Sequence, residues 1–412
     1  MDSHTEPTDS VVIVGAGHAG ATLAATLRQM KFTGSITVIG DEPHVPYHRP
    51  PLSKKFADDS MEQELRPREF YPDNSIELIL GAKVVSIDPH KKLVHFDDGQ
   101  SRGYGTVVIA TGATPRTIPV AGGDAKGAFT LRTLDDARGL GTALGQANAL
   151  VVIGGGYVGM EVAAVARANG VAVTVVEREN RILARVASTE FSHRLTERHS
   201  SHGTRILTSC DVAAFKTASN AVTAVVLGDG TVVDCDLVLV GIGATPNIDL
   251  ARGCGAECDG GILVDRVGRT TVPGVMAIGD VTVRPHDRID GLRRLESIPS
   301  AVEQAKHAAS AIVGHDGGTH EIPWFWSDQF DLKLKMAGLL EDDVQTVVRQ
   351  GVAADSYGLF HLRTDGTVCA VETANSPQAF MAGKKMISDR VSIDPIRLAD
   401  NEVSLREVAV AV

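Results

Sequence analysis

The chain has 412 residues, of which 51 are acidic and 40 basic, and its formal net charge is −11. Hydrophobic residues make up 43% and charged residues 22%, which excludes a disordered chain, because this much apolar surface can offset the entropy lost on ordering. The acidic balance argues against nucleic acid as the main partner, since phosphate binding needs a basic surface. The length exceeds what one core usually supports and therefore predicts two or three domains.

Cysteine usage and the first residues bear on the compartment. Five cysteines, odd in number and scattered, favour a reducing cytoplasm over a disulfide framework. The first ten residues, MDSHTEPTDS, have neither a positive region nor an apolar stretch, so we expect no secretory signal. The longest weakly charged stretch, residues 149–166, is interrupted by three glycines and by Glu161, a pattern that favours strand, turn and helix over a membrane span. The sequence predicts a soluble, cytoplasmic protein that does not bind membranes.

Short β-branched runs alternate with helical stretches such as residues 19–30. The runs are residues 11–14, 36–39, 107–109, 150–153, 173–176, 237–240 and 275–278. Continuous apolar strands of this length indicate parallel sheets covered on both faces. Residues 223–234 predict a hairpin around Gly228–Gly230, and residues 96–99 predict a second turn. From residue 323 the composition changes and both tryptophans, Trp324 and Trp326, occur together, which indicates a third domain.

The first glycine motif directly follows the run at residues 11–14. Gly15, Gly17 and Gly20 fill the GxGxxG positions, an order in which the glycines allow a tight turn, close approach of a pyrophosphate and packing of the following helix on the strand. The pyrophosphate would meet the N-terminus of that helix. Asp41 and Glu42 follow the second strand, at the distance where an acid accepts a hydrogen bond from a ribose hydroxyl.

The same unit returns near residue 150. Gly154, Gly156 and Gly159 repeat the pattern, and Glu177 ends the next strand. An acid at this place favours NADH over NADPH, because it would repel a 2′-phosphate. Arg178 and Arg181 lie close by and leave NADPH open. Two such loops in one chain predict two dinucleotides, a bound flavin and a nicotinamide that passes hydride to it.

Further motifs extend this pattern over nearly the whole chain. They are RPPLSK at 49–54, ATGATPR at 110–116, LRTLDDA at 131–137, GIGATPN at 241–247, AIGD at 277–280, ESIPSAVEQA at 296–305 and PWFWSDQ at 323–329. With these motifs the chain resembles the two-dinucleotide-domain flavoproteins, and among them the bacterial NADH-dependent ferredoxin reductases of the putidaredoxin reductase and aromatic dioxygenase type.

The resemblance implies an α/β fold with two Rossmann-like dinucleotide-binding domains, as in glutathione reductase, and a C-terminal α+β domain. FAD would lie on residues 1–116 and 245–322 and NADH on residues 117–244, while residues 323–412 would form an interface domain. The resemblance also implies flavin-binding roles for Ala19, Asp41, Lys54, Val84, Arg132, Asp280 and Ile298. Strand ends that pass close to cofactor are expected at Ala110, Thr111, Gly112, Gly243 and Gly279, where small residues permit close approach.

Lys54 and Glu161 form the sharpest candidate pair. Glu161 lies on an apolar helix two residues past the second glycine loop, where a carboxylate needs a partner. The resemblance implies that Lys54 and Glu161 lie together beside the flavin N5. There the lysine ammonium group would stabilise the negative charge of the reduced flavin, and the glutamate carboxylate would orient the lysine. The alternative is a surface lysine and a glutamate that interacts only with the helix dipole.

The segment that would carry a redox dithiol in related disulfide reductases, PHVPYHRPPLSKKF, contains no cysteine. The flavin would therefore pass electrons directly to an external acceptor, and a two-iron two-sulfur ferredoxin suits its one-electron chemistry. Cys254 and Cys258 are expected to be ordinary thiols, and no histidine cluster predicts a metal site.

Trp324 is a third candidate catalytic residue, and Trp326 shares its motif. Either tryptophan could lie at the flavin edge on the acceptor side, or both could be core aromatics. Candidate docking residues for an acidic ferredoxin are Arg288, Arg293, Arg294, Lys333, Lys335, Lys384 and Lys385, although most charge runs are only solvated faces.

The sequence thus predicts a ferredoxin–NAD(+) reductase, a monomer or weak homodimer, that supplies an oxygenase of the cytochrome or Rieske type. Two alternatives stay open. One is an NADH reductase for rubredoxin, quinone or oxygen. The other is a flavin redox signalling protein of the apoptosis-inducing-factor kind.

Overall fold

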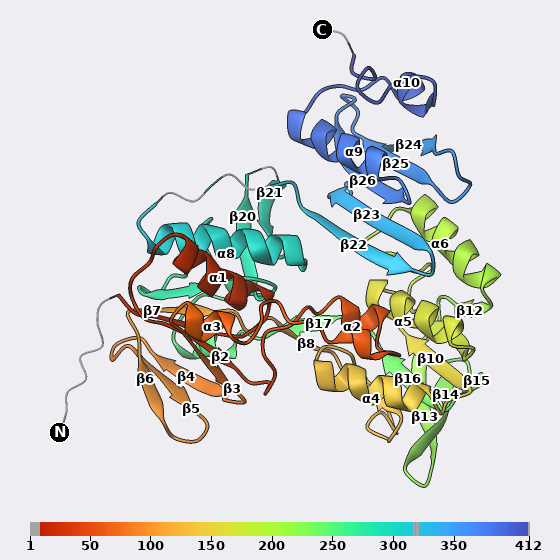
Figure 1. Ribbon diagram of the computed structural model, residues 1–412. Helices are drawn as coiled ribbons and strands as arrows, with labels where there is room; N and C mark the ends of the chain where they lie inside the picture. The colour runs from red at the N-terminus through yellow and green to blue at the C-terminus, as the bar shows by residue number, and fades with distance from the viewer. Residues whose placement is uncertain (1–8, 288, 316–317, 319–320, 411–412) are drawn as a thin grey trace, which may run out of the picture. The chain divides into compact units, whose positions relative to one another are not determined.

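In the computed structural model, which describes residues 9–287, 289–315, 318 and 321–410, the chain forms two compact units (Figure 1). The first unit comprises Met1–His48, Gln63–Thr114 and Thr245–Glu321. The second comprises Arg49–Glu62, Pro115–Ala244 and Ile322–Val412. The segment that carries RPPLSK therefore groups with the second unit, although its neighbours in sequence belong to the first.

A five-stranded parallel sheet organises the first unit, in the order β19-β7-β1-β2-β3. Its strands are β1 (Val11–Val14), β2 (Ile36–Gly40), β3 (Ile76–Leu80), β7 (Thr106–Ile109) and β19 (Val275–Ala277). Helices α1 (His18–Gln29) and α8 (Ile298–Ile312) lie side by side against it. The strand positions that the sequence predicts in this unit are confirmed to within a residue or two at each end.

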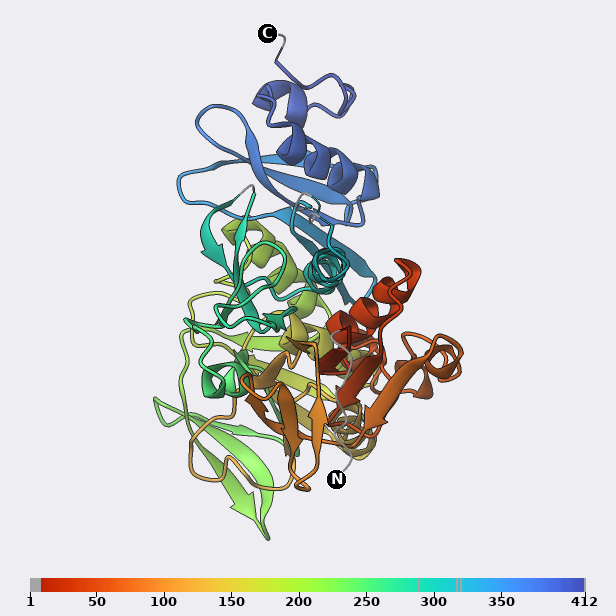
Figure 2. The same cartoon turned by 90° about the vertical axis from the view of Figure 1, so that its left-hand side faces the viewer.

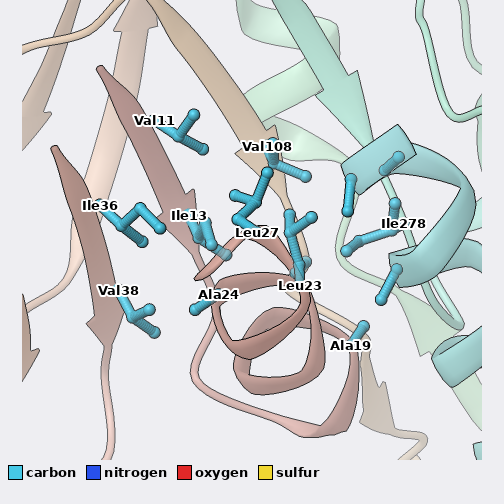
Figure 3. Close-up of a cluster of buried hydrophobic side chains, with 14 of the residues drawn as sticks. Val11, Ile13, Ala19, Leu23, Ala24, Leu27, Ile36, Val38, Val108 and Ile278 are labelled. Atoms are coloured by element: carbon cyan, nitrogen blue, oxygen red, sulfur yellow. The ribbon is translucent and has the colours of Figure 1, made fainter. Parts of the chain in front are cut away.

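Both faces of the sheet are buried at β1, β2, β7 and β19, which explains why these strands are largely apolar, whereas the edge strand β3 is only partly buried. On one face Val11 and Ile13 pack against Leu23 and Leu27 of α1, as Figure 3 shows. On the other face Val12 and Val14 join a second apolar cluster. That second cluster is completed by small elements of the same unit, which are β4 (Val84–Asp88), β5 (Leu93–Phe96), α7 (Asp249–Gly253) and β18 (Ile262–Leu263). Strand β6 (Ser101–Gly103) pairs with β5. The turn predicted at residues 96–99 joins β5 to β6.

Three more short elements belong to the first unit. They are α3 (Phe70–Asp73), β20 (Thr282–His286) and β21 (Ile289–Arg293), of which β20 pairs with β18 and β21. Farther along, the short strands β8 (Ala113–Pro115) and β17 (Ala244–Pro246) pair with each other.

A second parallel sheet repeats the first in the second unit, in the order β12-β11-β10-β16-β9. Its strands are β9 (Ala128–Phe129), β10 (Ala149–Ile153), β11 (Ala172–Val176), β12 (Thr204–Leu207) and β16 (Leu237–Val240). Its helices are α4 (Leu134–Leu144), α5 (Tyr157–Ala168) and α6 (Thr189–Ser201), with α2 (Pro51–Lys54) and the 3-10 turn η1 (Asp59–Met61) contributed by the early segment. The predicted hairpin is confirmed as β14 (Ala221–Leu227) and β15 (Val232–Asp234), and β14 also forms with β13 (Val212–Ala218) the long ribbon seen in Figure 2.

The C-terminal part is an antiparallel sheet in the order β22-β23-β26-β25-β24, covered by α9. Its elements are β22 (Trp324–Gln329), β23 (Leu332–Gly338), β24 (Gln345–Gln350), β25 (Tyr357–Leu362), β26 (Val368–Ala374), α9 (Pro377–Asp389) and α10 (Pro395–Ala399). Together with the two parallel sheets, this confirms the predicted fold class. Across the residues that the structure describes, no helix is both long and apolar enough to cross a membrane.

Candidate functional site

The first glycine of each loop lies where a side chain would collide with a neighbouring strand end. Gly15 has φ of +123° and Gly154 has φ of +99°, values that favour glycine. A Cβ on Gly15 would overlap the carbonyl group of Ala110, and a Cβ on Gly154 would overlap that of Gly241. These neighbours belong to the ATG and GIG motifs, so the structure places each motif directly beside one glycine loop.

The middle glycine of each loop is open on the side where a ligand would approach. No atom lies within 4 Å of a Cβ built on Gly17 or Gly156. Both residues are helix N-caps, and no side chain caps the first amide groups of α1 or α5, whereas Thr133, Ser188 and Ser297 cap α4, α6 and α8. Uncapped amides at the positive end of a helix dipole attract anions. Each loop therefore fits the pyrophosphate of a dinucleotide.

Close packing follows at the third glycine and at AIGD. A Cβ on Gly20 or Gly159 would overlap the carbonyl group of the first glycine in the same loop, so each helix can start this close to its strand only without a side chain there. A Cβ on Gly279 would lie 3.1 Å from that of Ala19, which is buried. The end of AIGD, and with it Asp280, thus lies at the start of α1.

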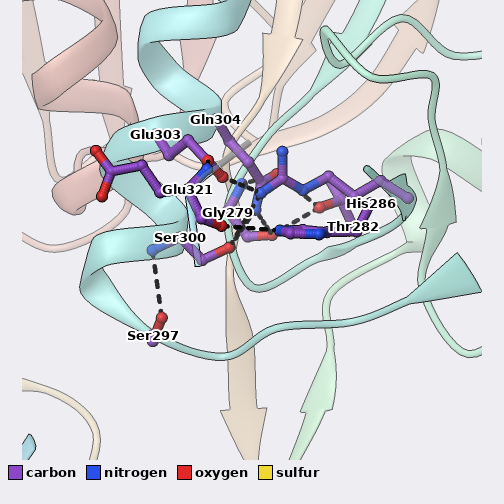
Figure 4. Close-up of polar contacts among 9 residues, drawn as sticks. Gly279, Thr282, His286, Ser297, Ser300, Glu303, Gln304 and Glu321 are labelled. Atoms are coloured by element: carbon purple, nitrogen blue, oxygen red, sulfur yellow. Dashed lines mark hydrogen bonds and ion pairs between the residues drawn. The ribbon is translucent and has the colours of Figure 1, made fainter. Parts of the chain in front are cut away.

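Helix α8 holds the AIGD turn in place (Figure 4). The Gln304 side-chain oxygen accepts hydrogen bonds from the Gly279 amide at 2.9 Å and from the Thr282 hydroxyl at 2.7 Å. The Gln304 amide group donates to the Ser300 hydroxyl at 3.2 Å. All of these side chains are buried. The ESIPSAVEQA motif therefore supplies the residue that fixes the turn before Asp280, a role that the sequence did not reveal.

Hydrogen bonds join the ATG motif at residues 110–112 to the ATPN part of GIGATPN at residues 244–247. The Thr111 hydroxyl donates to the Asn247 carbonyl and the Asn247 side-chain amide donates to the Thr111 carbonyl, both at 2.9 Å. The backbone amide of Asn247 also donates to the Gly112 carbonyl at 3.0 Å. Asn247 belongs to the motif GIGATPN, but the sequence alone does not indicate this role.

Glu177 is already fixed by backbone groups of its own loop region. Its Oε2 accepts from the Gly155 amide at 2.6 Å and its Oε1 from the Glu179 amide at 2.8 Å. The carboxylate therefore lies beside the second glycine loop. Arg178, which could have favoured NADPH, forms an exposed ion pair with Glu179.

The acid of the first unit is placed differently. Strand pairing matches Ile39 of β2 and Val176 of β11 with the residue just before each first glycine. In this register Glu177 corresponds to Gly40, and Asp41 stands one residue farther along. Asp41 is exposed, at the same edge of the sheet as the glycine loop.

The remaining predicted cofactor contacts lie in separate places. Val84 is buried on β4, and the half-buried Ile298 is the first residue of α8. In the second unit, the Arg132 carbonyl accepts from Arg49 Nη1 at 2.5 Å, and Gly243 has φ of +100° with open space around it.

Lys54 and Glu161 are brought together. Lys54 Nζ lies 2.7 Å from Glu161 Oε1, and the two side chains are 14% and 4% exposed. Lys54 is thus not a surface lysine, and Glu161 has a partner beyond the helix dipole. Two hydroxyl groups that the sequence did not indicate also bind the Glu161 carboxylate. Ser53 donates to Oε2, and Ser327 donates to Oε1 at 2.6 Å.

The two tryptophans are half-buried on β22. Their ring centroids are 5.8 Å apart, and the Trp324 ring lies 5.7 Å from that of Phe380 on α9. Lys384 Nζ lies 5.5 Å from the Trp324 ring and Lys335 Nζ lies 5.5 Å from the Phe380 ring. These five residues, Trp324, Trp326, Lys335, Phe380 and Lys384, are referred to below as the tryptophan–lysine cluster.

The other basic docking candidates are engaged locally. Ion pairs join Arg294 to Glu296, Lys333 to Asp328 at 3.2 Å and Lys385 to Asp389 at 2.7 Å. Arg293 donates to the backbone of Leu292, and Arg288 lies outside the described residues. In the tryptophan–lysine cluster, Lys335 and Lys384 lie against aromatic rings, so basic charge and aromatic side chains come together at one place.

Cysteines and metal ligands are the other groups that could carry redox chemistry. The five cysteines are free. Burial raises the pKa of the Cys254 and Cys258 thiols, which disfavours the reactive thiolate. Among residues with described side chains, no group of three or more histidine, cysteine or acidic residues could hold a metal.

Comparisons with known proteins agree with this geometry. The pyridine nucleotide-disulphide oxidoreductase family matches residues 9–305, and the reductase C-terminal family matches residues 324–409. The probable ferredoxin reductase CtmF of Castellaniella defragrans is 42% identical over 98% of this chain and 99% of its own.

Two crystal structures each share 38% identity with this chain and superpose on it with a TM-score of 0.93. The ferredoxin reductase for the CYP199A2 system of Rhodopseudomonas palustris covers 98% of this chain and 100% of its own. The covalent putidaredoxin reductase–putidaredoxin complex covers 97% of this chain and 98% of the matched chain. The chain therefore belongs to the pyridine nucleotide-disulphide oxidoreductase family, among its FAD-containing, NAD(H)-dependent ferredoxin reductases.

Proposed function

We propose that the protein transfers hydride from NADH to bound FAD and then delivers single electrons to a two-iron two-sulfur ferredoxin that supplies an oxygenase. The observation that carries this proposal is the duplicated glycine loop, open at Gly17 and Gly156 and uncapped at both helix N-termini. When bound, FAD supplies the conversion between a two-electron donor and a one-electron acceptor. The ferredoxin reductases among its relatives and the putidaredoxin complex support the choice of acceptor.

The two dinucleotides are assigned by motif. FAD would bind residues 1–116 and 245–322, NADH would bind residues 117–244, and residues 323–412 would form the interface domain. The residues proposed to hold FAD are Gly15, Gly17, Ala19, Gly20, Asp41, Lys54, Val84, Ala110, Thr111, Gly112, Arg132, Gly279, Asp280 and Ile298. Those proposed to hold NADH are Gly154, Gly156, Gly159, Glu177 and Gly243.

Lys54 is proposed to hold a positive charge beside the flavin, and Glu161 to fix the position of that charge. In a site shielded from water, a fixed ammonium group stabilises developing negative charge more than solvent would. The 2.7 Å ion pair and its burial support this role.

Lys54→Met tests it. We expect slower flavin reduction by NADH in stopped-flow measurements and a lower flavin midpoint potential. Lys55→Met, at the exposed neighbouring lysine, is the matched control. Wild-type rate and potential in Lys54→Met would remove the pair from the mechanism.

The acceptor is tested by a visible spectrum during NADH titration, followed by cytochrome c reduction with and without added ferredoxins. We expect a flavin spectrum that bleaches with NADH and a cytochrome reduction rate that depends on ferredoxin. Faster turnover with rubredoxin, quinone or oxygen would redirect the proposal. So would a long-lived reduced-flavin–NAD complex with slow turnover and NADH-dependent dimerisation, which a signalling protein would show.

The tryptophan–lysine cluster is proposed as the docking face for an acidic ferredoxin, with Trp324 at the electron exit. Its two lysines and its half-buried tryptophans support this choice. We further propose a cytoplasmic monomer or weak homodimer, for which the free cysteines suit a reducing compartment.

A further inference from the structure

Strand β22 has two faces with different surroundings. Side chains alternate along a strand, so Phe325, Ser327 and Gln329 share one face while Trp324 and Trp326 share the other. The tryptophan face belongs to the tryptophan–lysine cluster. The opposite face packs on the nicotinamide-binding part of the same unit, where Phe325 meets the ring of Tyr157 on α5 at 4.9 Å.

A continuous line of buried hydrogen bonds runs along this second face. His199 Nε2 lies 2.9 Å from Gln329 Oε1, the Gln329 amide group donates to Ser327 Oγ at 3.1 Å, and Ser327 donates to Glu161 Oε1 at 2.6 Å. All four side chains are buried, and Ser327, Gln329 and His199 have no exposed surface. The line ends at the carboxylate that pairs with Lys54.

Every bond in the line donates toward Glu161. Because the Gln329 oxygen faces His199, the imidazole must donate from Nε2. Burial lowers the pKa of His199 to about 4, so the ring is neutral near pH 7 and carries a single proton. Its Nδ1 is buried without a hydrogen-bond partner, which fits an imidazole protonated at Nε2. Aligned donors polarise one another, which strengthens the last bond to the carboxylate.

We propose that Ser327 and Gln329 are positioning residues of the Lys54–Glu161 pair, so that the C-terminal domain completes the environment of this carboxylate. The inference rests on the proposed role of Lys54 beside the flavin. Ser53 and Lys54 hold Glu161 from α2, and Ser327 holds it from β22. With donors on both sides, the carboxylate cannot rotate without breaking one of them, and the ammonium group stays where the carboxylate holds it.

Ser327→Ala is the direct test. It removes one donor from Glu161 Oε1 and leaves the Gln329 amide without its acceptor. A hydrogen bond to a charged group is among the stronger ones, so we expect flavin reduction by NADH to slow by about tenfold with little change in KM for NADH. We also expect a shifted midpoint potential of the bound FAD. Gln329→Met should move both quantities in the same direction, by about threefold in rate.

Thr373→Val is the matched control. Thr373 is equally buried in the same sheet, and its hydroxyl group donates to the Lys335 carbonyl at 2.9 Å instead of to Glu161. This variant should keep the wild-type potential and reduction rate even if its thermal stability falls.

Combined variants separate this inference from the proposed function. If Ser327 acts through the pair, Ser327→Ala should have no further effect on rate or potential in a Lys54→Met background. The apoprotein should show the same coupling, since the loss of thermal stability from Ser327→Ala should shrink in Glu161→Gln.

Three outcomes decide the matter. Wild-type rate and potential in both Ser327→Ala and Gln329→Met, with Lys54→Met impaired, would overturn the inference alone. An undiminished effect of Ser327→Ala in the Lys54→Met background would also overturn it. No effect of Lys54→Met itself would overturn the proposed role of the pair.

Discussion

At the scale of single residues, Glu177, which we propose to contact NADH, is held in position by backbone groups of its own chain. Both carboxylate oxygens accept from backbone amides at the second glycine loop. The negative charge is therefore held at the loop at little entropic cost when a dinucleotide binds. A ribose hydroxyl can donate to such a carboxylate, whereas a 2′-phosphate is repelled by it.

Glu177→Gln removes this charge while keeping an acceptor oxygen. We expect the ratio of kcat/KM for NADH to that for NADPH to fall by about tenfold, the size of one like-charge interaction near a surface. Steady-state kinetics with the two cofactors measure the ratio. Glu190→Gln, on α6 and paired with Arg194, is the control and should leave it unchanged. Equal ratios in wild type and Glu177→Gln would show that the carboxylate does not select the cofactor.

Single residues were predictable where their motif was local. The sequence located both glycine triplets and indicated that Glu161, on an apolar helix, needs a partner. It did not identify Ser53 or Ser327 as donors to that carboxylate, because hydroxyl groups carry little pattern of their own. Ser327 lies far from Glu161 in sequence, and only the packing of β22 on α5 joins them.

At the scale of elements, helix α6 carries a buried histidine, and burial disfavours the protonated form of its ring. His199 is fully buried, and burial lowers its pKa from 6.5 to about 4. Between these two values the unfolded chain binds a proton that the folded chain does not. Stability therefore falls as the pH drops from about 6.5 to about 4, by up to about 3 kcal/mol from this group.

His199→Gln should flatten this part of the stability profile. Urea unfolding at pH 7 and at pH 4.5 measures the slope in each variant. His193→Gln, at an exposed histidine of the same helix, should retain the wild-type slope. The nearby Asp331, whose pKa is lowered by Arg198, also loses its contribution toward acid pH, and it does so equally in both variants. A wild-type slope in His199→Gln would contradict the assignment.

Elements were predicted well where apolar runs were continuous. The strands β1, β2, β7, β19, β10, β11 and β16 stand out because most of their residues are buried, whereas β3, β9 and β12, whose residues are mostly half-buried or exposed, were not predicted. The antiparallel C-terminal sheet was predicted only as a class, because the order β22-β23-β26-β25-β24 depends on pairings that no local pattern encodes. The same holds for the segment Arg49–Glu62, which groups with the second unit through long-range contacts.

At the scale of the whole molecule, a net charge of −11 must be reconciled with the acidic ferredoxin that we propose as the partner. Repulsion between two acidic proteins slows their association, and a local basic patch on one of them restores the association rate. The tryptophan–lysine cluster, which places Lys335 and Lys384 beside aromatic rings, is the patch that we propose for this role.

The dependence of electron transfer on ionic strength tests this arrangement. We expect ferredoxin reduction to change strongly with ionic strength while ferricyanide reduction does not, because salt screens the charges at a docking surface. Lys384→Gln should raise KM for ferredoxin, and Lys385→Gln on the same helix should not. The same salt response for both acceptors would exclude electrostatic docking.

The two faces of β22 have a consequence for engineering. Exchanging the last ninety or so residues between reductases is an obvious way to retarget them to a new electron carrier. In this protein such a graft would also import the residue that stands at Ser327, and with it a direct contact to the Glu161 carboxylate. A chimera that keeps serine at position 327 and glutamine at position 329 would leave the hydrogen-bond donors of the Glu161 carboxylate intact. One that loses them would change both the choice of electron carrier and the surroundings of Glu161 in the same exchange.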